Sequence, residues 1–238
     1  MAKVNISSQQ SAVSIITCTK RRYCLDALLR NYSRQNYQNK ELIIILNHSK
    51  LNMDEYIIAA KPYKNVRIYS LPNYSLGSCL NYGVKVAKYN YIAKFDDDDY
   101  YAPGYLKDSM QVLRKTNADI IGKRAHYMYL NGKKTLLHRY NNMADKYVPL
   151  VQGATLLVKR HVFSKVSFPN RNRGESVKFC SDSRAKGFKI YAGNPYNFVA
   201  YRRKNSRDHT WIVSDKSLLT GKVKVLKVRD PEKFVTRG

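Results

Sequence analysis

Strand-like and helix-like segments alternate through the first hundred residues of this chain. Short apolar, β-branched runs at 12–19, 40–47, 65–72 and 89–96 predict buried strands. Between them, the segments 21–35, 53–63 and 76–88 carry apolar residues at helical spacing. This alternation across short links is typical of an α/β domain with a mainly parallel sheet. Ligands of such sheets bind beyond the carboxyl ends of the strands, so we expect functional residues there.

The second half of the chain is less regular. Residues 104–115 predict a helix, and 118–140 predict two strands joined at an Asn-Gly turn, which is a hairpin signal. The segments 152–166 and 174–193 add a strand and two short helices, and 194–203 a further strand. The predicted organisation is an extension at 1–11, one domain at 12–212, and a lysine-rich C-terminal tail at 213–238 with alternating valines.

A formal net charge of +26, from 43 basic and 17 acidic residues, predicts anionic partners. A nucleotide, a phosphate-bearing polymer, a membrane surface and a nucleic acid all satisfy this expectation. The N-terminus lacks the apolar core of a signal peptide, and no apolar run approaches the length of a membrane span. Four cysteines without metal-ligand spacing indicate reduced thiols, so we expect a cytoplasmic protein.

Four consecutive aspartates, Asp96 to Asp99, directly follow a predicted strand in the segment "YIAKFDDDDYYAP". Carboxylates this close repel one another, and their pKa values rise unless a cation compensates. Mg²⁺ and Mn²⁺ favour such oxygen ligands. The position after an apolar strand, in a chain poor in acids, favours a metal site over a solvated acidic loop. Because side chains alternate along an extended chain, Asp96 and Asp98 are expected to share one face.

Four segments together resemble family 2 glycosyltransferases: "VSIITCTKRR", "ELIIILN", "SLGSCLNYGVKVAKYNYIAKFDDDDYYAPGYL" and "GATLLVKRHVF". They occur in the family's order, and the resemblance covers roughly residues 12–212. It implies the GT-A fold, a Rossmann-like nucleotide-diphospho-sugar transferase fold. Residues 12–103 would bind the nucleotide sugar, and 104–212 would supply the acceptor site and the catalytic base. The run from Leu76 to Leu106 most resembles members linked to spore-surface glycan assembly, which implies the mother cell of a spore-forming bacterium.

The resemblance implies separate roles for the aspartates. Asp98 would be the main ligand of a Mn²⁺ or Mg²⁺ ion that bridges the two phosphates of the donor. Asp96 would face the ribose or the sugar, and Asp99 would support the loop. Asp97 occupies the family's variable position; it is grouped with the nucleotide-binding residues, and the resemblance implies no role of its own for it.

Other positions are implied to contact the nucleotide. Cys18 and Thr19, at the end of the first strand, would line the base. Asn81 and Gly83 match the family's Asn-x-Gly motif. Asn81 would hold a loop over the nucleotide, and Gly83 would allow close approach of helix and sheet.

The end of the second strand departs from the family's pattern. The family usually has two aspartates there, of which the second accepts a hydrogen bond from uracil, and this chain has Leu46 and Asn47. The amide oxygen of Asn47 can accept from a ring N–H, without the strength of a charged acceptor. UDP is the favoured nucleotide, while thymidine or another base stays open.

An inverting transfer also needs a carboxylate base. In "RGESVKF", Glu175 aligns best with the family's acidic segment before a helix. Many members place the base one position later, which is Ser176 here, and Asp182 is a further candidate. A glutamate at a helix start can also serve only to stabilise the helix dipole.

The segment "DHTW" at 208–211 resembles a late family motif. His209 would reach the metal or the diphosphate, and Trp211 would be a packing residue or a sugar platform. Arg202, Arg203 or Arg207 would neutralise the leaving diphosphate, and we place Arg203 in the site.

Three functions follow from these observations. The first is a metal-dependent, inverting glycosyltransferase that uses a nucleotide-diphosphate sugar and a glycan, protein or anionic polymer as acceptor. The second, motivated by the charge, is a nucleic-acid-binding protein or metal-dependent nuclease. The basic residues are spread along the chain and no recognition motif occurs, so we expect no specific nucleic-acid partner, although contact with an anionic surface is expected. The third, motivated by Asn47 and Ser176, is a catalytically weak relative that binds sugar nucleotides or glycans.

Overall fold

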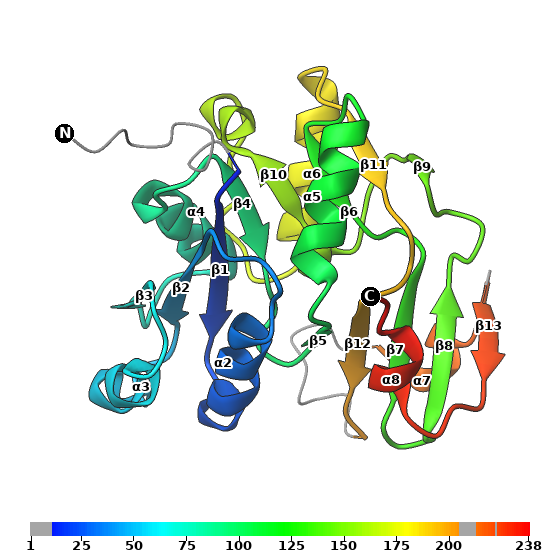
Figure 1. The fold of residues 1–238 in the computed structure, drawn as a ribbon, viewed down its shortest axis with the longest axis horizontal. Helices are drawn as coiled ribbons and strands as arrows, with labels where there is room; N and C mark the ends of the chain where they lie inside the picture. The colour runs from blue at the N-terminus through cyan, green and yellow to red at the C-terminus, as the bar shows by residue number, and fades with distance from the viewer. Residues whose placement is uncertain (1–10, 205–212, 222) are drawn as a thin grey trace.

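Two β-sheets organise the chain in the computed structural model, which describes residues 11–204, 213–221 and 223–238. The larger sheet has the strand order β3-β2-β1-β4-β10-β6-β11-β9, and the smaller has the order β13-β8-β7-β12-β5. Figure 1 shows the larger sheet with its helices at the left and centre, and the smaller sheet at the right.

The first half forms the parallel part of the larger sheet, as predicted. Its four neighbouring strands are β1 (Val13–Thr19), β2 (Lys40–Leu46), β3 (Val66–Ser70) and β4 (Tyr91–Lys94), and all three pairings are parallel. The helical elements between them are η1 (Arg22–Cys24, a 3₁₀ turn), α2 (Leu25–Ser33), α3 (Met53–Ala60) and α4 (Leu76–Val86). β1 and β2 are apolar on both faces because helices cover both sides.

The second half makes the larger sheet mixed. β10 (Leu157–Lys159) runs antiparallel to both β4 and β6 (Ile120–Gly122). β11 (Ile190–Ala192) pairs parallel with β6, and β9 (Lys146–Tyr147) closes the edge. The helical elements of this half are α5 (Tyr105–Lys115), η2 (Gly153–Thr155), η3 (Arg160–Ser164) and α6 (Glu175–Ala185). The GT-A-like α/β fold is confirmed, and its unbroken run of parallel strands, β3-β2-β1-β4, lies in the first half of the chain.

The smaller sheet contains the predicted hairpin. Its strands are β5 (Tyr100–Tyr101), β7 (His126–Leu130), β8 (Thr135–Arg139), β12 (Phe198–Arg202) and β13 (Val223–Leu226). β7 and β8 pair antiparallel across the turn, and β12 lies parallel to β7 and antiparallel to β5. Because β5 directly follows the aspartates, the acidic loop is one of the links between the two sheets.

The C-terminal segment is packed into the domain, which differs from the predicted tail. β13 pairs with β8, and Val235 in α8 (Pro231–Val235) is fully buried. Leu218, in the short helix α7 (Asp215–Leu218), is also buried. The alternating valines, which the sequence assigned to a basic tail, form the strand β13 at the edge of the smaller sheet. This strand pairs with β8.

α4 lies unusually close to β1. A Cβ atom at Gly83 would lie 2.6 Å from Cγ2 of Ile16, and one at Gly77 would lie 1.8 Å from the carbonyl oxygen of Pro169. Only glycine permits these approaches. The predicted structural role of Gly83 is confirmed, because this residue lets α4 pack closely against Ile16 of β1.

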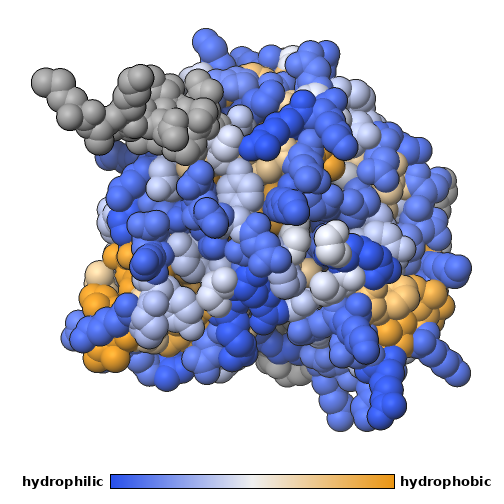
Figure 2. Space-filling view, in the orientation of Figure 1, coloured by the Kyte–Doolittle hydropathy of each residue, from blue (hydrophilic) through white to orange (hydrophobic). Residues whose placement is uncertain are grey.

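Most of the face shown in Figure 2 is hydrophilic, as the charge predicts. An apolar area at the lower left lies where Figure 1 places α3, whose Met53, Ile57 and Ile58 are exposed. Within the described residues, no helix combines the length and the apolar character needed to cross a membrane.

Candidate functional site

The acidic loop lies at the carboxyl end of β4, the position that the sequence predicts for a site. Its four carboxylates point into different environments. The side chain of Asp96 is 39% exposed, that of Asp98 is 15% exposed, and that of Asp97 is 2% exposed. Burial therefore separates the residues that a ligand can reach from those that hold the loop.

Asp97 is an internal anchor. Its Oδ2 accepts a hydrogen bond from Oγ1 of Thr19 at 2.5 Å and another from Nε of Arg21 at 3.2 Å. Nη2 of Arg21 forms an ion pair with Oδ1 of the same carboxylate. The geometry gives Asp97 and the Thr19 hydroxyl a role in fixing the loop to β1, and their grouping with the nucleotide-binding residues stays a prediction.

Asp98 faces two guanidinium groups. Nη1 of Arg21 lies 3.0 Å from its Oδ2, and Nη2 of Arg203 lies 3.3 Å from the same atom. Even so, burial and the neighbouring Asp97 carboxylate raise the pKa of Asp98 to about 6. Burial and the neighbouring carboxylates therefore oppose ionisation of Asp98 more strongly than the two guanidiniums favour it.

The other two aspartates are bonded to different strands. Asp96 forms an ion pair with Lys94, and its backbone N–H donates to the hydroxyl of Tyr101 at 2.8 Å. Oδ1 of Asp99 accepts from the backbone N–H of Tyr201 in β12 at 3.0 Å. Burial and the charge of Asp98 raise the pKa of Asp99 well above its usual range. The predicted supporting role of Asp99 is consistent with this bond to the smaller sheet.

The sequence predicted only one of the two arginines beside Asp98. Arg203 was predicted, and its guanidinium also lies over the ring of Tyr23, 4.8 Å from the centroid, and donates to the Tyr23 hydroxyl. Arg21 and Tyr23 were missed. The available signal was the "TKRRY" run directly after β1, since side chains there reach the same edge of the sheet as the aspartates.

Asn47 and Cys18 lie together at the ends of β2 and β1. Nδ2 of Asn47 donates to the carbonyl oxygens of Leu71 at 3.0 Å and Tyr74 at 2.7 Å, which fixes the loop after β3. Its amide oxygen is then the group that can accept from a nucleotide base. Cys18 is half-buried, and a hydrogen bond with Cys79, together with burial, raises the pKa of its thiol.

Asn81 fastens α4 to the chain before α6. Its Nδ2 donates to the carbonyl oxygen of Phe168 at 2.8 Å, and its Oδ1 accepts from the N–H of Phe168 at 2.9 Å. Both ends of the amide are engaged with the backbone of one residue. These bonds give Asn81 a part in holding this loop, and the predicted place of the loop over the nucleotide stays a prediction.

Glu175 begins α6 and is 7% exposed. Oγ of Ser176 donates to its Oε1 at 2.8 Å, so the serine at the family's usual base position orients the glutamate. Asp182 lies on an exposed part of the helix and pairs with Lys178. Glu175 is therefore the better placed of the two candidate bases.

His209 and Trp211 lie outside the described residues, as does Arg207. Within the residues that the structure describes, no group of three or more His, Cys, Asp or Glu could hold a metal. Mg²⁺ commonly takes one or two carboxylates and completes its shell with water and substrate phosphates. Asp98, with its raised pKa, and the accessible Asp96 fit that kind of site.

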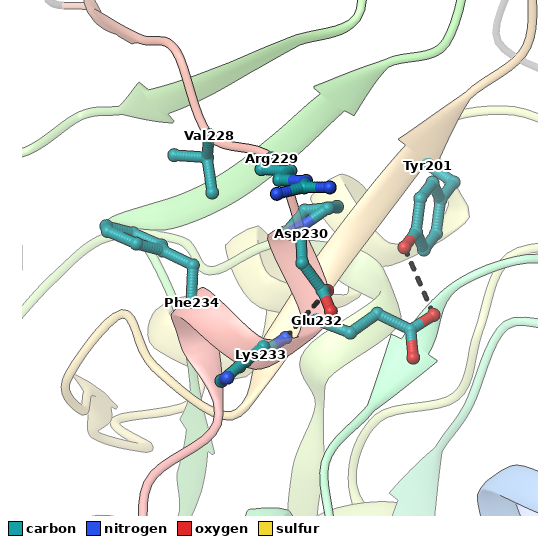
Figure 3. A pocket seen from close by; sticks show the side chains of 8 residues that line it. Tyr201, Val228, Arg229, Asp230, Glu232, Lys233 and Phe234 are labelled. Atoms are coloured by element: carbon teal, nitrogen blue, oxygen red, sulfur yellow. Dashed lines mark hydrogen bonds between the residues drawn. The ribbon is translucent and has the colours of Figure 1, made fainter.

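A cavity of about 830 Å³ lies near the loop and is lined by Tyr201 and residues 228–234 (Figure 3). The Tyr201 hydroxyl donates to Oε1 of Glu232 across it at 3.1 Å. None of the predicted site residues lines this cavity. Its connection to the acidic loop is the backbone of Tyr201, which is bonded to Asp99.

Residues 14–204 match the model of glycosyl transferase family 2. The chain belongs to glycosyltransferase family 2. An uncharacterised glycosyltransferase of Rickettsia conorii is 32% identical over 190 residues, covering 74% of this chain and 30% of that protein. The O-antigen biosynthesis glycosyltransferase WbnJ of Escherichia coli is 29% identical over 150 residues, covering 59% and 58%. This family 2 chain spans from 14% to 58% of the curated relatives it matches.

Two kinds of solved structure share the fold. Staphylococcus aureus TarS (residues 1–349) in complex with UDP-GlcNAc gives a TM-score of 0.64 at 16% identity, covering 82% of this chain and 59% of that one. A Pyrobaculum calidifontis mannosyltransferase in complex with GDP-Man and Mn²⁺ gives 0.65 at 14% identity, covering 80% and 56%. At 16% and 14% identity, these similarities show a shared fold and nothing more.

Proposed function

We propose that this chain is a metal-dependent, inverting glycosyltransferase that moves a sugar from a nucleotide-diphosphate donor to a glycan, polymer or protein acceptor. The single observation that carries the proposal is Asp98, a reachable carboxylate at the end of a parallel strand whose pKa is raised to about 6. A divalent cation bound there would offset the burial and the neighbouring carboxylate that raise this pKa, and it would lie beyond the carboxyl ends of the strands, where ligands of α/β sheets bind.

Asp98, with Asp96 beside it, would hold the Mn²⁺ or Mg²⁺ ion. When bound, the ion supplies Lewis acidity to the leaving diphosphate. Arg21 and Arg203 already point their guanidiniums at Asp98, so they are placed to neutralise further negative charge there. Asp97 and Asp99 keep the loop in place by their bonds to Thr19 and Tyr201.

Glu175 acts as the base. Its carboxylate accepts the proton of the acceptor hydroxyl while that oxygen attacks the anomeric carbon, which inverts the configuration. The hydrogen bond from Ser176 fixes the orientation of the carboxylate. His209 and Trp211 are retained as proposed contacts to the metal or diphosphate and to the sugar.

UDP is the proposed nucleotide. The amide oxygen of Asn47 and the end of β1 at Cys18 offer an acceptor and a half-buried surface for the base. The two structural neighbours carry UDP-GlcNAc and GDP-Man, so the fold accommodates more than one base. We therefore expect the side chains of Asn47 and Cys18 to determine which base binds.

An anionic glycan of the cell envelope is the proposed acceptor class. The net charge of +26 favours such a polymer, and WbnJ is named for O-antigen biosynthesis. A spore-surface glycan in a spore-forming mother cell is the narrower prediction from the resemblance of the segment 76–106.

The donor site is tested by calorimetry and thermal shift with UDP, dTDP and GDP in the presence of Mn²⁺. UDP is expected to raise the Tm of the wild type and to leave that of Asp98→Asn unchanged. Absence of any nucleotide effect at saturating Mn²⁺ would refute the proposal.

The base is tested by donor turnover. Glu175→Gln is expected to lower kcat by at least about 100-fold while the Kd for UDP stays within threefold, because general base catalysis typically contributes factors of this size. Asp182→Asn, the matched control on the exposed part of α6, should keep wild-type kcat. Full turnover by Glu175→Gln would remove this residue from the mechanism.

A further inference from the structure

The cavity beside the smaller sheet lies outside the proposed donor site. It is lined by Tyr201 of β12 and by the segment 228–234, which runs into α8. Figure 3 shows Val228 and Phe234 on one side of it and Tyr201 and Glu232 on the other. The valine and the two aromatic residues are half-buried, so they give the cavity an apolar wall. Ligand sites typically combine such a wall with a few polar groups that fix the orientation of the ligand.

The carboxylates of this cavity are already engaged within the protein. Oδ1 of Asp230 accepts a hydrogen bond from the backbone N–H of Lys233 at 3.0 Å and so caps the start of α8. Oε1 of Glu232 accepts from the Tyr201 hydroxyl at 3.1 Å, and its Oε2 lies 3.8 Å from Nη1 of Arg34. Both acids therefore have donors in the protein, and these donors partly offset their negative charge.

The cations of the cavity are available to a ligand. Arg229 and Lys233 line the cavity and are exposed. Among the residues that the structure describes, neither side chain has an ion pair or a hydrogen bond. Lys224 and Lys227 are further exposed cations on the same segment. Because the acids are engaged and the cations are available, the cavity favours an anionic ligand.

Tyr201 connects the cavity to the acidic loop. Its backbone N–H donates to Oδ1 of Asp99 at 3.0 Å. Two residues further along the chain, Nη2 of Arg203 lies 3.3 Å from Oδ2 of Asp98. Two residues of extended chain span roughly 7 Å. A short oligosaccharide is therefore long enough to occupy the cavity with one unit and to reach the acidic loop with another.

We propose that this cavity binds an acidic sugar unit of the acceptor, a saccharide that carries a carboxylate or a phosphate. Arg229 and Lys233 bind the anionic group, and the wall of Tyr201, Val228 and Phe234 contacts the apolar face of the ring. The inference rests on the proposed function and deepens it, because it adds a contact with the acceptor away from the reacting atoms. An acceptor held at two points is oriented for the transfer.

Binding is measured by titration calorimetry of the full chain without metal or donor. The probes are tetragalacturonate, which has a carboxylate on every sugar, and the neutral maltotetraose. We expect tetragalacturonate to bind with an affinity that falls as the salt concentration rises, and maltotetraose to bind at least about tenfold more weakly. Galacturonate and glucose 6-phosphate, compared as single sugars, show whether the cavity prefers the carboxylate or the phosphate.

Two changes of opposite sign test whether the probe binds in this cavity. Arg229→Gln combined with Lys233→Gln should weaken binding of tetragalacturonate at least about fivefold at low salt, because two exposed charge contacts are lost. Glu232→Gln removes a negative charge and keeps an acceptor for the tyrosine hydroxyl, so it should tighten binding about two- to threefold. The matched control is Lys61→Gln combined with Lys64→Gln, two exposed lysines after α3, and it should change the Kd less than about twofold.

Four results would overturn the role of the cavity. They are the absence of binding by the wild type, wild-type affinity in the Arg229 and Lys233 double variant, no tightening by Glu232→Gln, and displacement of tetragalacturonate by UDP with Mn²⁺, which would indicate the donor site. A tetraglutamate peptide that bound as tightly as the sugar would equally refute recognition of a saccharide.

The outcomes separate the two proposals. Each of these results leaves the proposed function standing, because the donor and base tests use none of these probes. Binding of tetragalacturonate that responds to both changes, in a protein that UDP with Mn²⁺ does not stabilise, would refute the proposed function and keep the cavity as a site for acidic sugars.

Discussion

Replacing Asp98 by asparagine should stabilise the metal-free protein. In the folded chain, burial and Asp97 raise the pKa of Asp98 to about 6, whereas the ordinary value is 3.8. Because the folded pKa is raised, the folded state holds the proton more tightly than the unfolded state, and stability falls as pH rises from about 4 to 6. A shift of two units corresponds to about 3 kcal/mol at 1.4 kcal/mol per unit.

The neutral amide removes this penalty. The gain in the free energy of unfolding for Asp98→Asn should approach about 3 kcal/mol at pH 8 and about half of that at pH 5, where part of the wild type is protonated. For a chain of this size the upper value corresponds to a rise in Tm of about 6–12 °C. The measurement is thermal or urea unfolding in a chelator across pH 5 to 8, with Asp182→Asn as the exposed control.

Adding Mn²⁺ and UDP should reverse the order, since only the wild type gains stability from a ligand that its folded state binds. The reasoning would be refuted if metal-free Asp98→Asn were no more stable than the wild type at pH 8. It would be equally refuted if the two proteins differed by the same amount at pH 5 and pH 8.

Three further changes test the packing around the site. Gly83→Ala should cost about 1–3 kcal/mol because its Cβ would press on Ile16, whereas Gly193→Ala, with its nearest contact at 3.6 Å, should change the Tm little; urea unfolding compares them. Asp97→Ala should lower the free energy of unfolding by about 1.5–3 kcal/mol, since it removes the charged acceptor of Thr19 and Arg21 while Arg21 keeps Asp98, and an unchanged urea midpoint would contradict the anchor role. Removal of residues 213–238 should lower the Tm or abolish soluble expression, because it takes away β13 and α8, whereas removal of Gly238 alone should not.

The first half of the chain was predictable because its signals are local. Apolar β-branched runs, helical spacing and the aspartates after a strand depend on neighbouring residues, and the structure places β1 to β4 where those signals lie. The site residues that were missed depend on distant partners. Arg21 meets Asp97 across 76 positions, and no local pattern identifies that ion pair.

The C-terminal segment was misjudged for a related reason. Lysines alternate with valines in 222–227, and the charge suggested a solvated tail. The same alternation is typical of a β-strand. The pairing with β8, which lies far away in the sequence, is what makes this segment a strand. Asn81 matched a motif residue whose amide, in this fold, binds the backbone of Phe168.

The acidic loop also connects several separate elements of the fold. It is the short connection from β4 to β5, and its members are tied to four separate elements: β1 through Thr19, β4 through Lys94, α2 through Asn31 and β12 through Tyr201. At Asp99 the loop is bonded to the backbone of Tyr201 in the smaller sheet, and the side chain of Tyr201 lines the cavity beside Glu232. One short acidic segment therefore holds the end of the larger sheet, a strand of the smaller sheet and one wall of the cavity in a fixed relation.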